Sequence, residues 1–216
     1  VIELGRSLGL IWWDLSAYGD LRAGMPIAAT SAATLARAQD EACFHLAHGR
    51  ACTEQSDYDE AQGLLQRARA ASHDAIADAQ IDIALARVAH ERGEFDAGIA
   101  LLDTAIRTLE ASVENSRLLA EALYVRARLA YKREECAAAV EYGEKALQAH
   151  RFAHDDRGII ATLCILGTAY SEIDDHENAV KCCADALTRC DSLDDQLRRG
   201  EALYALSQVE CKGRRL

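Results

Sequence analysis

The chain has 216 residues, half of them hydrophobic, and carries a formal net charge of −11. So acidic a chain is not expected to bind DNA or RNA, because surfaces that track the phosphate backbone are usually basic. Its longest apolar stretches, GLIWW and GIIATLCILG, are much shorter than the ~20 residues that a membrane-spanning helix needs. Ala is abundant and Pro occurs once, a composition that favours helices. We therefore expect a soluble, helical protein without membrane insertion.

The cysteines indicate the compartment. They show no close-paired metal-binding spacing, and most lie within helical apolar patterns, so we expect free, mostly buried thiols in a reducing cytoplasm. No secretory signal is visible, and the sequence starts at Val1 without an initiator Met, which suggests a fragment of a larger protein. The eight cysteines are Cys43, Cys52, Cys136, Cys164, Cys182, Cys183, Cys190 and Cys211.

Residues 1–40 fit a degenerate leading pair of helices. Pro26 is the one residue that disturbs the helical pattern here, and we interpret it as the first residue of a helix that starts near Met25. Trp12 and Trp13 are adjacent, so one indole is expected to pack in the core while the other faces the groove or a partner.

Residues 41–190 contain a repeat. Small residues recur at Gly49, Ala86, Ala127 and Gly167, with spacings of 37, 41 and 40 residues. A second set recurs with the same spacings in the segments that follow, together with an alanine seven residues later in each. The second set is Ala61, Gly98, Ala139 and Ala179, followed by Ala68, Ala105, Ala146 and Ala186.

Each repeat unit has two amphipathic helical patterns joined by a short polar turn, and no segment resembles a strand. The turns are EQSD, HERG, KREE and EIDD. One helical hairpin cannot bury its apolar stripe alone, so neighbouring hairpins should stack. The small residues then allow close helix approach, which explains Gly98 and Ala105 inside an otherwise apolar helix. Residues 195–213 fit a lone closing helix.

The spaced alanines, together with LGTAY at 166–170, SDYDEA at 56–61 and GEFDAG at 93–98, resemble the tetratricopeptide repeat family. The resemblance implies an all-α, right-handed α-solenoid superhelix of about five helical pairs plus the closing helix, forming a single domain over residues 1–216. The repeats exceed the usual length of about 34 residues and lack the Pro that commonly closes the second helix. Longer repeats of this kind are similar to those of bacterial signalling proteins, in which a helical sensor array precedes an output domain.

In this family the first helices of successive pairs line a concave groove, and the residue after the small position faces into it. Three successive arginines occupy that column, and guanidinium groups bind carboxylates in a bidentate way, so an acidic peptide or protein segment is the expected ligand. Alternatively, Arg50 and Arg87 form weak pairs with Glu54 and Glu91 one turn later on their own helices. The column is Arg50, Arg87, Arg128, Thr168 and Gln208; one turn earlier lie Leu46, Ile83, Tyr124, Cys164 and Tyr204, and one turn later Thr53, His90, Tyr131, Ser171 and Cys211.

A metal-dependent sensor is a competing interpretation. His45, His48 and Cys52 lie on one helical face, and Zn²⁺ binds such groups. The repeat register turns these positions toward the partner helix, which favours packed histidines instead. The acidic segments CDSLDDQ and SEIDDHEN lack the alternating oxygen ligands and central Gly of a calcium loop, and are interpreted as turns and helix starts.

These observations predict a non-catalytic scaffold without a cofactor, whose groove residues Arg50, Arg87, Arg128, Tyr124, Tyr131, His90 and Tyr204 bind a protein or peptide. The resemblance suggests the sensory or regulatory part of a multidomain bacterial signalling protein, with an output domain attached. A structural self-assembly module is the main alternative, because neither terminus has an obviously polar cap, and homo-oligomerisation would follow from it.

Overall fold

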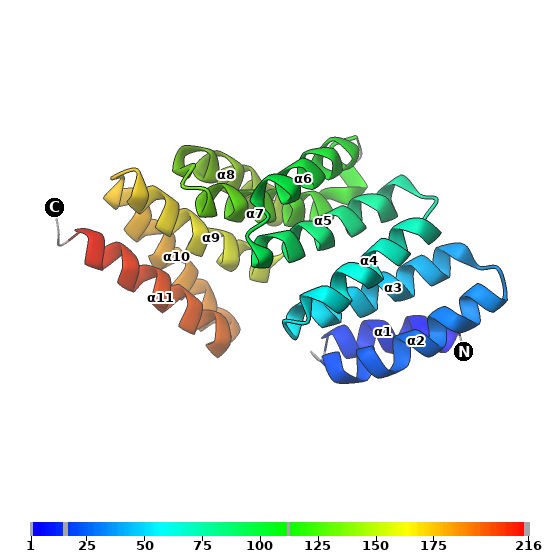
Figure 1. The fold of residues 1–216 in the computed structure, drawn as a ribbon. Coiled ribbons are helices and arrows are strands. Elements are labelled where there is room, and N and C mark those ends of the chain that lie inside the picture. The colour runs from blue at the N-terminus through cyan, green and yellow to red at the C-terminus, as the bar shows by residue number, and fades with distance from the viewer. Residues whose placement is uncertain (1, 15–16, 112, 214–216) are drawn as a thin grey trace. The chain divides into compact units, whose positions relative to one another are not determined.

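The computed structural model describes residues 2–14, 17–111 and 113–213, and within these ranges every regular element is helical. The side chains of Trp12 and Trp13 lie outside the described residues. Eleven α-helices and one 3₁₀ turn are present there, which confirms the expected five pairs and closing helix. The helices are α1 Ile2–Asp14, α2 Tyr18–Thr34, α3 Ala38–Glu54, α4 Tyr58–Ala71, α5 Ala75–Arg92, α6 Phe95–Leu109, α7 Ser116–Lys132, α8 Cys136–Phe152, α9 Asp156–Glu172, α10 His176–Leu193 and α11 Gln196–Gly213, with the 3₁₀ turn η1 at Val113–Asn115 (Figure 1).

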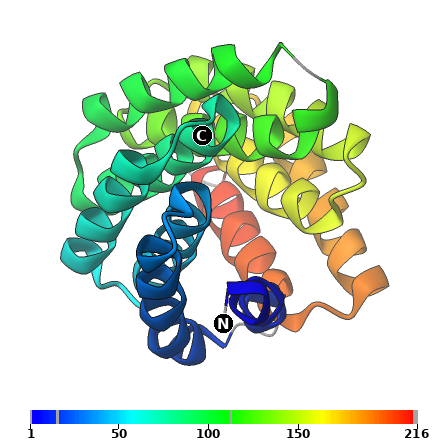
Figure 2. The same cartoon turned by 90° about the vertical axis from the view of Figure 1, so that its right-hand side faces the viewer.

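The helices form two compact units, Val1–Thr108 and Leu109–Leu216. In the first unit α2 packs between α1 and α3, α3 packs on α4, and α5 contacts both α3 and α4. In the second unit α7 pairs with α8 and α9 with α10, while α9 also contacts α7, α8 and α11 (Figure 2). Each unit is therefore a row of antiparallel hairpins with nearest-neighbour contacts, as the repeat predicts. No helix among the described residues is both long and apolar enough to cross a bilayer.

The small residues mark where the two helices of a hairpin touch. A Cβ atom added at Gly49 would lie 2.9 Å from Cγ of Leu65 on α4 and 3.3 Å from the carbonyl oxygen of Ala61. At Gly167 on α9 it would lie 2.6 Å from Sγ of Cys183 on α10. Gly98 and Ala105 on α6 are likewise buried. The prediction that these positions permit close helix approach is confirmed at Gly49 and Gly167.

The polar turns inside the hairpins share one backbone conformation. Ser56, Gly93, Glu134 and Asp174 all have positive φ, between 61° and 75°. They follow each other at the repeat spacings of 37, 41 and 40 residues. This left-handed residue reverses the chain after each first helix, and only Gly93 adopts it without steric cost.

Pro26 corrects one sequence-based expectation. It lies inside α2, which runs from Tyr18 to Thr34, and not at the start of a helix near Met25. Its side chain is on the exposed face, and its carbonyl oxygen accepts a hydrogen bond from Oγ1 of Thr30 at 2.8 Å. Proline removes one backbone donor from the helix interior, but burial of Leu21 and Met25 before it and of Ala28 and Ala32 after it holds both halves of α2 against the core.

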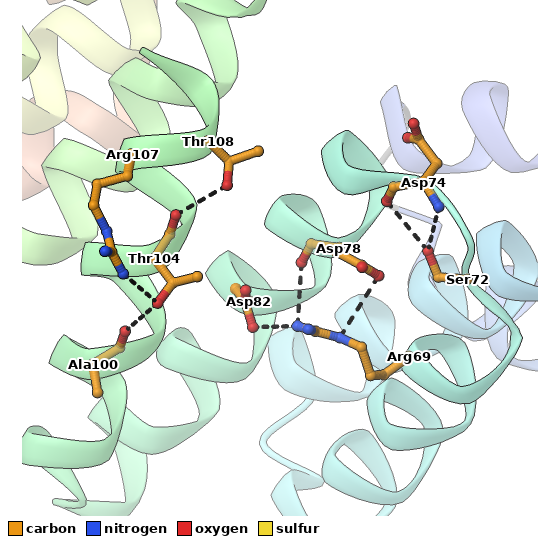
Figure 3. Close-up of polar contacts among 9 residues, drawn as sticks. All are labelled: Arg69, Ser72, Asp74, Asp78, Asp82, Ala100, Thr104, Arg107 and Thr108. Atoms are coloured by element: carbon orange, nitrogen blue, oxygen red, sulfur yellow. Dashed lines mark hydrogen bonds and ion pairs between the residues drawn. The ribbon is translucent and has the colours of Figure 1, made fainter. Parts of the chain in front are cut away.

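The α4–α5 junction in the first unit is held by charge (Figure 3). Arg69 on α4 donates through Nη2 to the Asp82 carboxylate and, at 3.3 Å, to the carbonyl oxygen of Asp78, both on α5. Asp82 is only 4% exposed, and burial raises the pKa of its carboxyl. Asp74 begins α5 as its N-cap, because its Oδ2 accepts from the Ala77 amide at 2.8 Å. These contacts fix how successive hairpins join within the unit.

Candidate functional site

In the second unit, the first helices of two successive pairs and the closing helix surround a hollow of about 560 Å³. These helices are α7, α9 and α11, and α9 contacts both of the others. Eight residues line the hollow. Five of them occupy predicted groove positions of the repeat, and the other three directly follow such positions on α9 and α11. The lining residues are Tyr131, Thr168, Ser171, Glu172, Gln208, Val209, Cys211 and Lys212.

The hollow combines an apolar surface with hydrogen-bonding groups. Val209 lines it from within the core, with no exposed surface of its own, and the hydroxyl of Thr168 donates to the carbonyl oxygen of Ile165 at 2.9 Å. Burial raises the pKa of the Tyr131 phenol, so at neutral pH it keeps its proton and can donate a hydrogen bond. Such a lining suits a segment of extended peptide that offers both an apolar side chain and backbone polar groups.

One charged pair lies at the edge of this hollow. Nζ of Lys212 on α11 donates to Oε2 of Glu172 on α9 at 3.1 Å and lies 3.5 Å from Oδ1 of Asp174. Glu172 and Lys212 line the hollow. An anionic group of a ligand could therefore replace Glu172 as the partner of Lys212, and a cationic group could replace Lys212 as the partner of Glu172. The sequence analysis did not include Glu172, Val209 and Lys212, because none of them occupies a predicted groove position. Each directly follows such a position in the sequence, and this adjacency could have identified them.

The other predicted groove residues of this unit lie outside that lining. Arg128 on α7 places its guanidinium 5.9 Å from the centre of the Tyr124 ring, a cation–π contact within one helix. Tyr204 on α11 is 67% exposed. Sequence analysis did not single out Arg126, which is 9% exposed and stacks 4.5 Å from the centre of the Tyr142 ring on α8.

In the first unit the predicted arginines lie on α3 and α5. Arg50 is half-buried on α3. Nη2 of Arg87 on α5 donates to Oε1 of Glu54 at the end of α3, with 3.2 Å between the atoms. The structure therefore shows a pair between two helices that the sequence did not suggest. Glu91 accepts a hydrogen bond from Nδ1 of His90 at 2.9 Å.

His90 offers little surface to a ligand. The side chain is 8% exposed, and its ring lies 6.4 Å from the ring of Phe95 on α6. Leu46 and Ile83, at the column one turn before the arginines, are buried in the first unit as well. In the first unit this side of the helices is thus more closely packed than the sequence alone suggested.

The structure changes the predicted metal-binding triad. Ligand atoms of His48, Cys52 and Glu60 all lie within 4.8 Å of one another, whereas His45 is not a member of this group. Nε2 of His45 lies 3.7 Å from Oε1 of Glu41 on the same helix. The triad His45, His48 and Cys52 is therefore wrong in one member, because the turn after α3 brings Glu60 from α4 across the helix pair.

The acidic segments begin helices, as expected. In SEIDDHEN, Oδ1 of Asp175 accepts from the Asn178 amide at 3.2 Å. Asp155 lies outside these segments and begins α9 in the same way, since its Oδ1 accepts from the Gly158 amide at 3.0 Å. Oδ1 of Asp195 accepts from the Arg198 amide at 3.1 Å. A second hollow of about 500 Å³ lies between the α8–α9 and α10–α11 turns. Its acidic lining includes Asp155 and Asp195, which are already used as caps.

All eight cysteines are free in the structure. Cys52, Cys183 and Cys190 are buried, and Cys43 and Cys211 are exposed. Burial raises the pKa of the Cys182 thiol to about 11, so this thiol stays protonated at neutral pH and is a poor nucleophile.

No protein-family model and no curated protein sequence matches the chain. Among solved structures, the apo form of RapI is similar, with a TM-score of 0.70 and 16% identity over 81% of this chain. PlcR of Bacillus thuringiensis, solved in complex with the peptide PapR7 and DNA, is similar with a TM-score of 0.73 and 14% identity over 89%. The chain spans 65% of the RapI chain and 70% of the PlcR chain. This likeness establishes an α-solenoid of helical hairpins; membership of the tetratricopeptide family itself stays a prediction.

Proposed function

We propose that the chain is a non-catalytic scaffold that binds a peptide or protein segment against the first helices of its hairpins. The observation that carries the proposal is the hollow between α7, α9 and α11, which is lined at the positions where the repeat register expects a ligand. The similarity to PlcR, whose structure contains a bound peptide, supports a peptide as the ligand. We further propose that the scaffold is the regulatory part of a larger cytoplasmic bacterial signalling protein.

The preferred ligand is proposed to be acidic. Arg50, Arg87 and Arg128 occupy one column of the repeat register, and a guanidinium recognises a carboxylate through two parallel hydrogen bonds. Binding would favour one conformation of the hairpin array over others, and an attached output domain could respond to that shift. Tyr131 would contribute its ring and its hydroxyl donor, while Tyr124 and Tyr204 are the remaining proposed groove residues; His90, which is 8% exposed, would contribute little.

A peptide-display library panned against the purified chain tests this function. The expected result is a family of selected peptides that combine acidic residues with an apolar residue. Gln208→Trp, an exposed position on the wall of the hollow, should fill the hollow and weaken those peptides at least about tenfold. Ser207→Trp adds the same side chain one residue away, outside the lining, and is the matched control. Equal affinity for both variants would contradict the site, and failure to select any peptide family would contradict the function.

Self-assembly is the second candidate, and the exposed side of α11 favours it. Leu197 and Tyr204 are 77% and 67% exposed, and Leu203 is 44% exposed. Leu163, which occupies the position of Leu203 in the preceding repeat, is only 3% exposed. A Cβ added at Gly200 would contact nothing within 4 Å. This side of α11 is thus an apolar surface of the kind that mediates protein association.

A further inference from the structure

A second cluster of ligand-type side chains lies in the first unit, apart from the proposed peptide site. His48 and Cys52 are four residues apart on α3 and therefore share one face of the helix. Glu60 reaches the same place from the first turn of α4. One nitrogen, one sulfur and one oxygen atom from these residues lie within 4.8 Å of one another. Tetrahedral zinc ligands are separated by somewhat less than this, since metal–ligand bonds are about 2.0–2.3 Å long.

The histidine of this cluster has an unused nitrogen. His48 is only 6% exposed, and its Nε2 has no hydrogen-bond partner among the residues that the structure describes. The nearest carboxylate oxygen, Oε1 of Glu60, lies 3.8 Å away, which is beyond hydrogen-bonding distance. A buried polar atom without a partner costs roughly one to three kcal/mol, so such atoms are uncommon and call for an explanation. A metal ion at this point would give Nε2 the partner that it lacks.

The charges around the cluster suit a divalent cation. Arg22 on α2 donates through Nη2 to Oδ2 of Asp57 at 2.9 Å and also contacts Oε2 of Glu60. The other oxygen of Glu60, Oε1, is the one directed toward His48. Arg22 thus holds one carboxylate oxygen and orients the other, as outer-shell partners of metal ligands do. Once the Cys52 thiol is deprotonated, the cluster has three negative groups, Cys52, Asp57 and Glu60, against the one positive guanidinium of Arg22. This excess of negative charge favours a bound cation.

We propose that His48, Cys52 and Glu60 bind one thiol-preferring divalent ion of the Zn²⁺ type through Nε2, Sγ and Oε1. The set of one nitrogen, one thiolate and one carboxylate matches the ligand chemistry of zinc, and a water molecule would complete a tetrahedron. Cys52 has no exposed surface, whereas the Glu60 side chain is 41% exposed, so the ion enters past Glu60. The ion joins the end of α3 to the start of α4 and so fastens the second hairpin.

Binding of this ion should release a proton. Burial raises the pKa of the Cys52 thiol to about 12, and the neighbouring Glu60 carboxylate acts in the same direction. The thiol is therefore protonated at neutral pH, and its proton passes to solvent when Sγ binds the metal. Burial lowers the pKa of His48, so its imidazole is already neutral and ready to coordinate. Arg22, Asp57 and His45 are the other charged or titratable groups that face the cluster, and affinity should rise with pH.

The test is titration of the reduced, chelator-stripped chain with Zn²⁺ and Co²⁺. We expect one equivalent bound more tightly than about micromolar, a higher melting temperature, and a thiolate-to-cobalt charge-transfer band with the intense visible bands of tetrahedral Co²⁺. Cys52→Ser should abolish the charge-transfer band. Glu60→Gln, which alters a partly exposed side chain and leaves the core intact, should weaken binding at least about tenfold.

Two matched variants separate this site from the other thiols and histidines. Cys183→Ser removes an equally buried thiol from the second unit, and His45→Gln removes the neighbouring histidine on α3. Both should retain the bound equivalent and the cobalt spectrum. The proposal is overturned if the chain binds no stoichiometric Zn²⁺, or if Cys52→Ser and Glu60→Gln bind the ion as the unaltered chain does. Because neither variant touches the hollow of the second unit, peptide binding serves as an independent readout.

Discussion

The guanidinium of Arg87 and the carboxylate of Glu54 are joined across two hairpins, with 3.2 Å between Nη2 and Oε1. Each side chain is 30% exposed, so the pair is partly hydrated. If an acidic ligand binds Arg87, as proposed, Glu54 competes with the carboxylate of that ligand. The ion pair therefore bears on ligand affinity more than on stability, because half-exposed pairs contribute at most about 1 kcal/mol.

Replacing Glu54 with Gln should raise affinity for an acidic peptide severalfold and lower the free energy of unfolding by less than about 1 kcal/mol. The gain should shrink at high salt, because the new contact is between partly hydrated charges. Isothermal titration at two salt concentrations measures the gain in affinity and its dependence on salt, and chemical denaturation measures the change in the free energy of unfolding. Glu141→Gln is the control, since it breaks the exposed pair between Glu141 and Lys145 within α8. An unchanged affinity for Glu54→Gln would place Arg87 outside the binding surface.

Gly167→Ala should destabilise the second unit. The added Cβ would lie 2.6 Å from Sγ of Cys183 and 3.3 Å from the Ala179 carbonyl oxygen, which cannot withdraw easily. Overpacking of this kind costs about 1–3 kcal/mol, which outweighs the gain of up to ~1 kcal/mol in helix propensity. Chemical denaturation gives the difference, and Cys183→Ala in the same chain should restore part of it.

Gly63→Ala is the matched control for that substitution. Gly63 lies inside α4, and a Cβ there would contact nothing within 4 Å. The gain in helix propensity is then unopposed, so this variant should be more stable by roughly 0.5–1 kcal/mol. If both substitutions changed stability in the same direction, close approach at Gly167 would not be the reason for its glycine.

Most of the fold could be predicted from the repeat, because the small residues recur at fixed spacings and the left-handed turn residues follow the same spacings. Gly49 and Gly167 meet the second helix of their hairpins as predicted, and Ser56 and Asp174 reverse the chain at equivalent points. A periodic pattern fixes which face of each helix is buried, and this information is local in sequence. The expectation for Pro26 was wrong because burial of its neighbours on α2 outweighs the lost backbone hydrogen bond.

The candidate sites were harder to predict because they depend on contacts between helices. Spacing along α3 brought His48 and Cys52 together, but nothing in that spacing indicates that Glu60 replaces His45. Glu54, which accepts a hydrogen bond from Arg87, lies 33 residues earlier in the chain, whereas the sequence pattern indicates only partners one turn away. Such contacts depend on how one helix is rotated relative to the next, and the periodicity of a single helix does not predict that rotation.

Asp155 should make the chain sensitive to acid. Its Oδ2 accepts a hydrogen bond from Nδ1 of His150 at 3.0 Å, and this contact lowers the pKa of Asp155 to about 2 from 3.8. Because the folded-state pKa lies below the unfolded one, the stabilisation is fully present above about pH 4 to 5 and is lost as the pH falls toward 2. Its size is about 2 kcal/mol.

Asp155→Asn should therefore lower stability at pH 7 and flatten the loss of stability between pH 5 and 2, as measured by denaturation at several pH values. Asp175→Asn is the control, because Asp175 also caps a helix but its side chain accepts from Asn178 rather than from a histidine. An equally steep acid limb in Asp155→Asn and the unaltered chain would show that the His150 contact does not contribute.

The apolar side of α11 predicts reversible self-association. Leu203 is 44% exposed and lies beside Gly200, where the surface is open. Light scattering should therefore give a mass that rises with concentration, and Leu203→Asp should shift this association to at least about tenfold higher concentration by placing a charge in the contact. Ile27→Asp, which alters a 65% exposed side chain on α2, should associate as the unaltered chain does. A monomeric mass at every concentration, or equal effects of the two substitutions, would rule out α11 as an association surface and leave the peptide-binding proposal as the sole candidate.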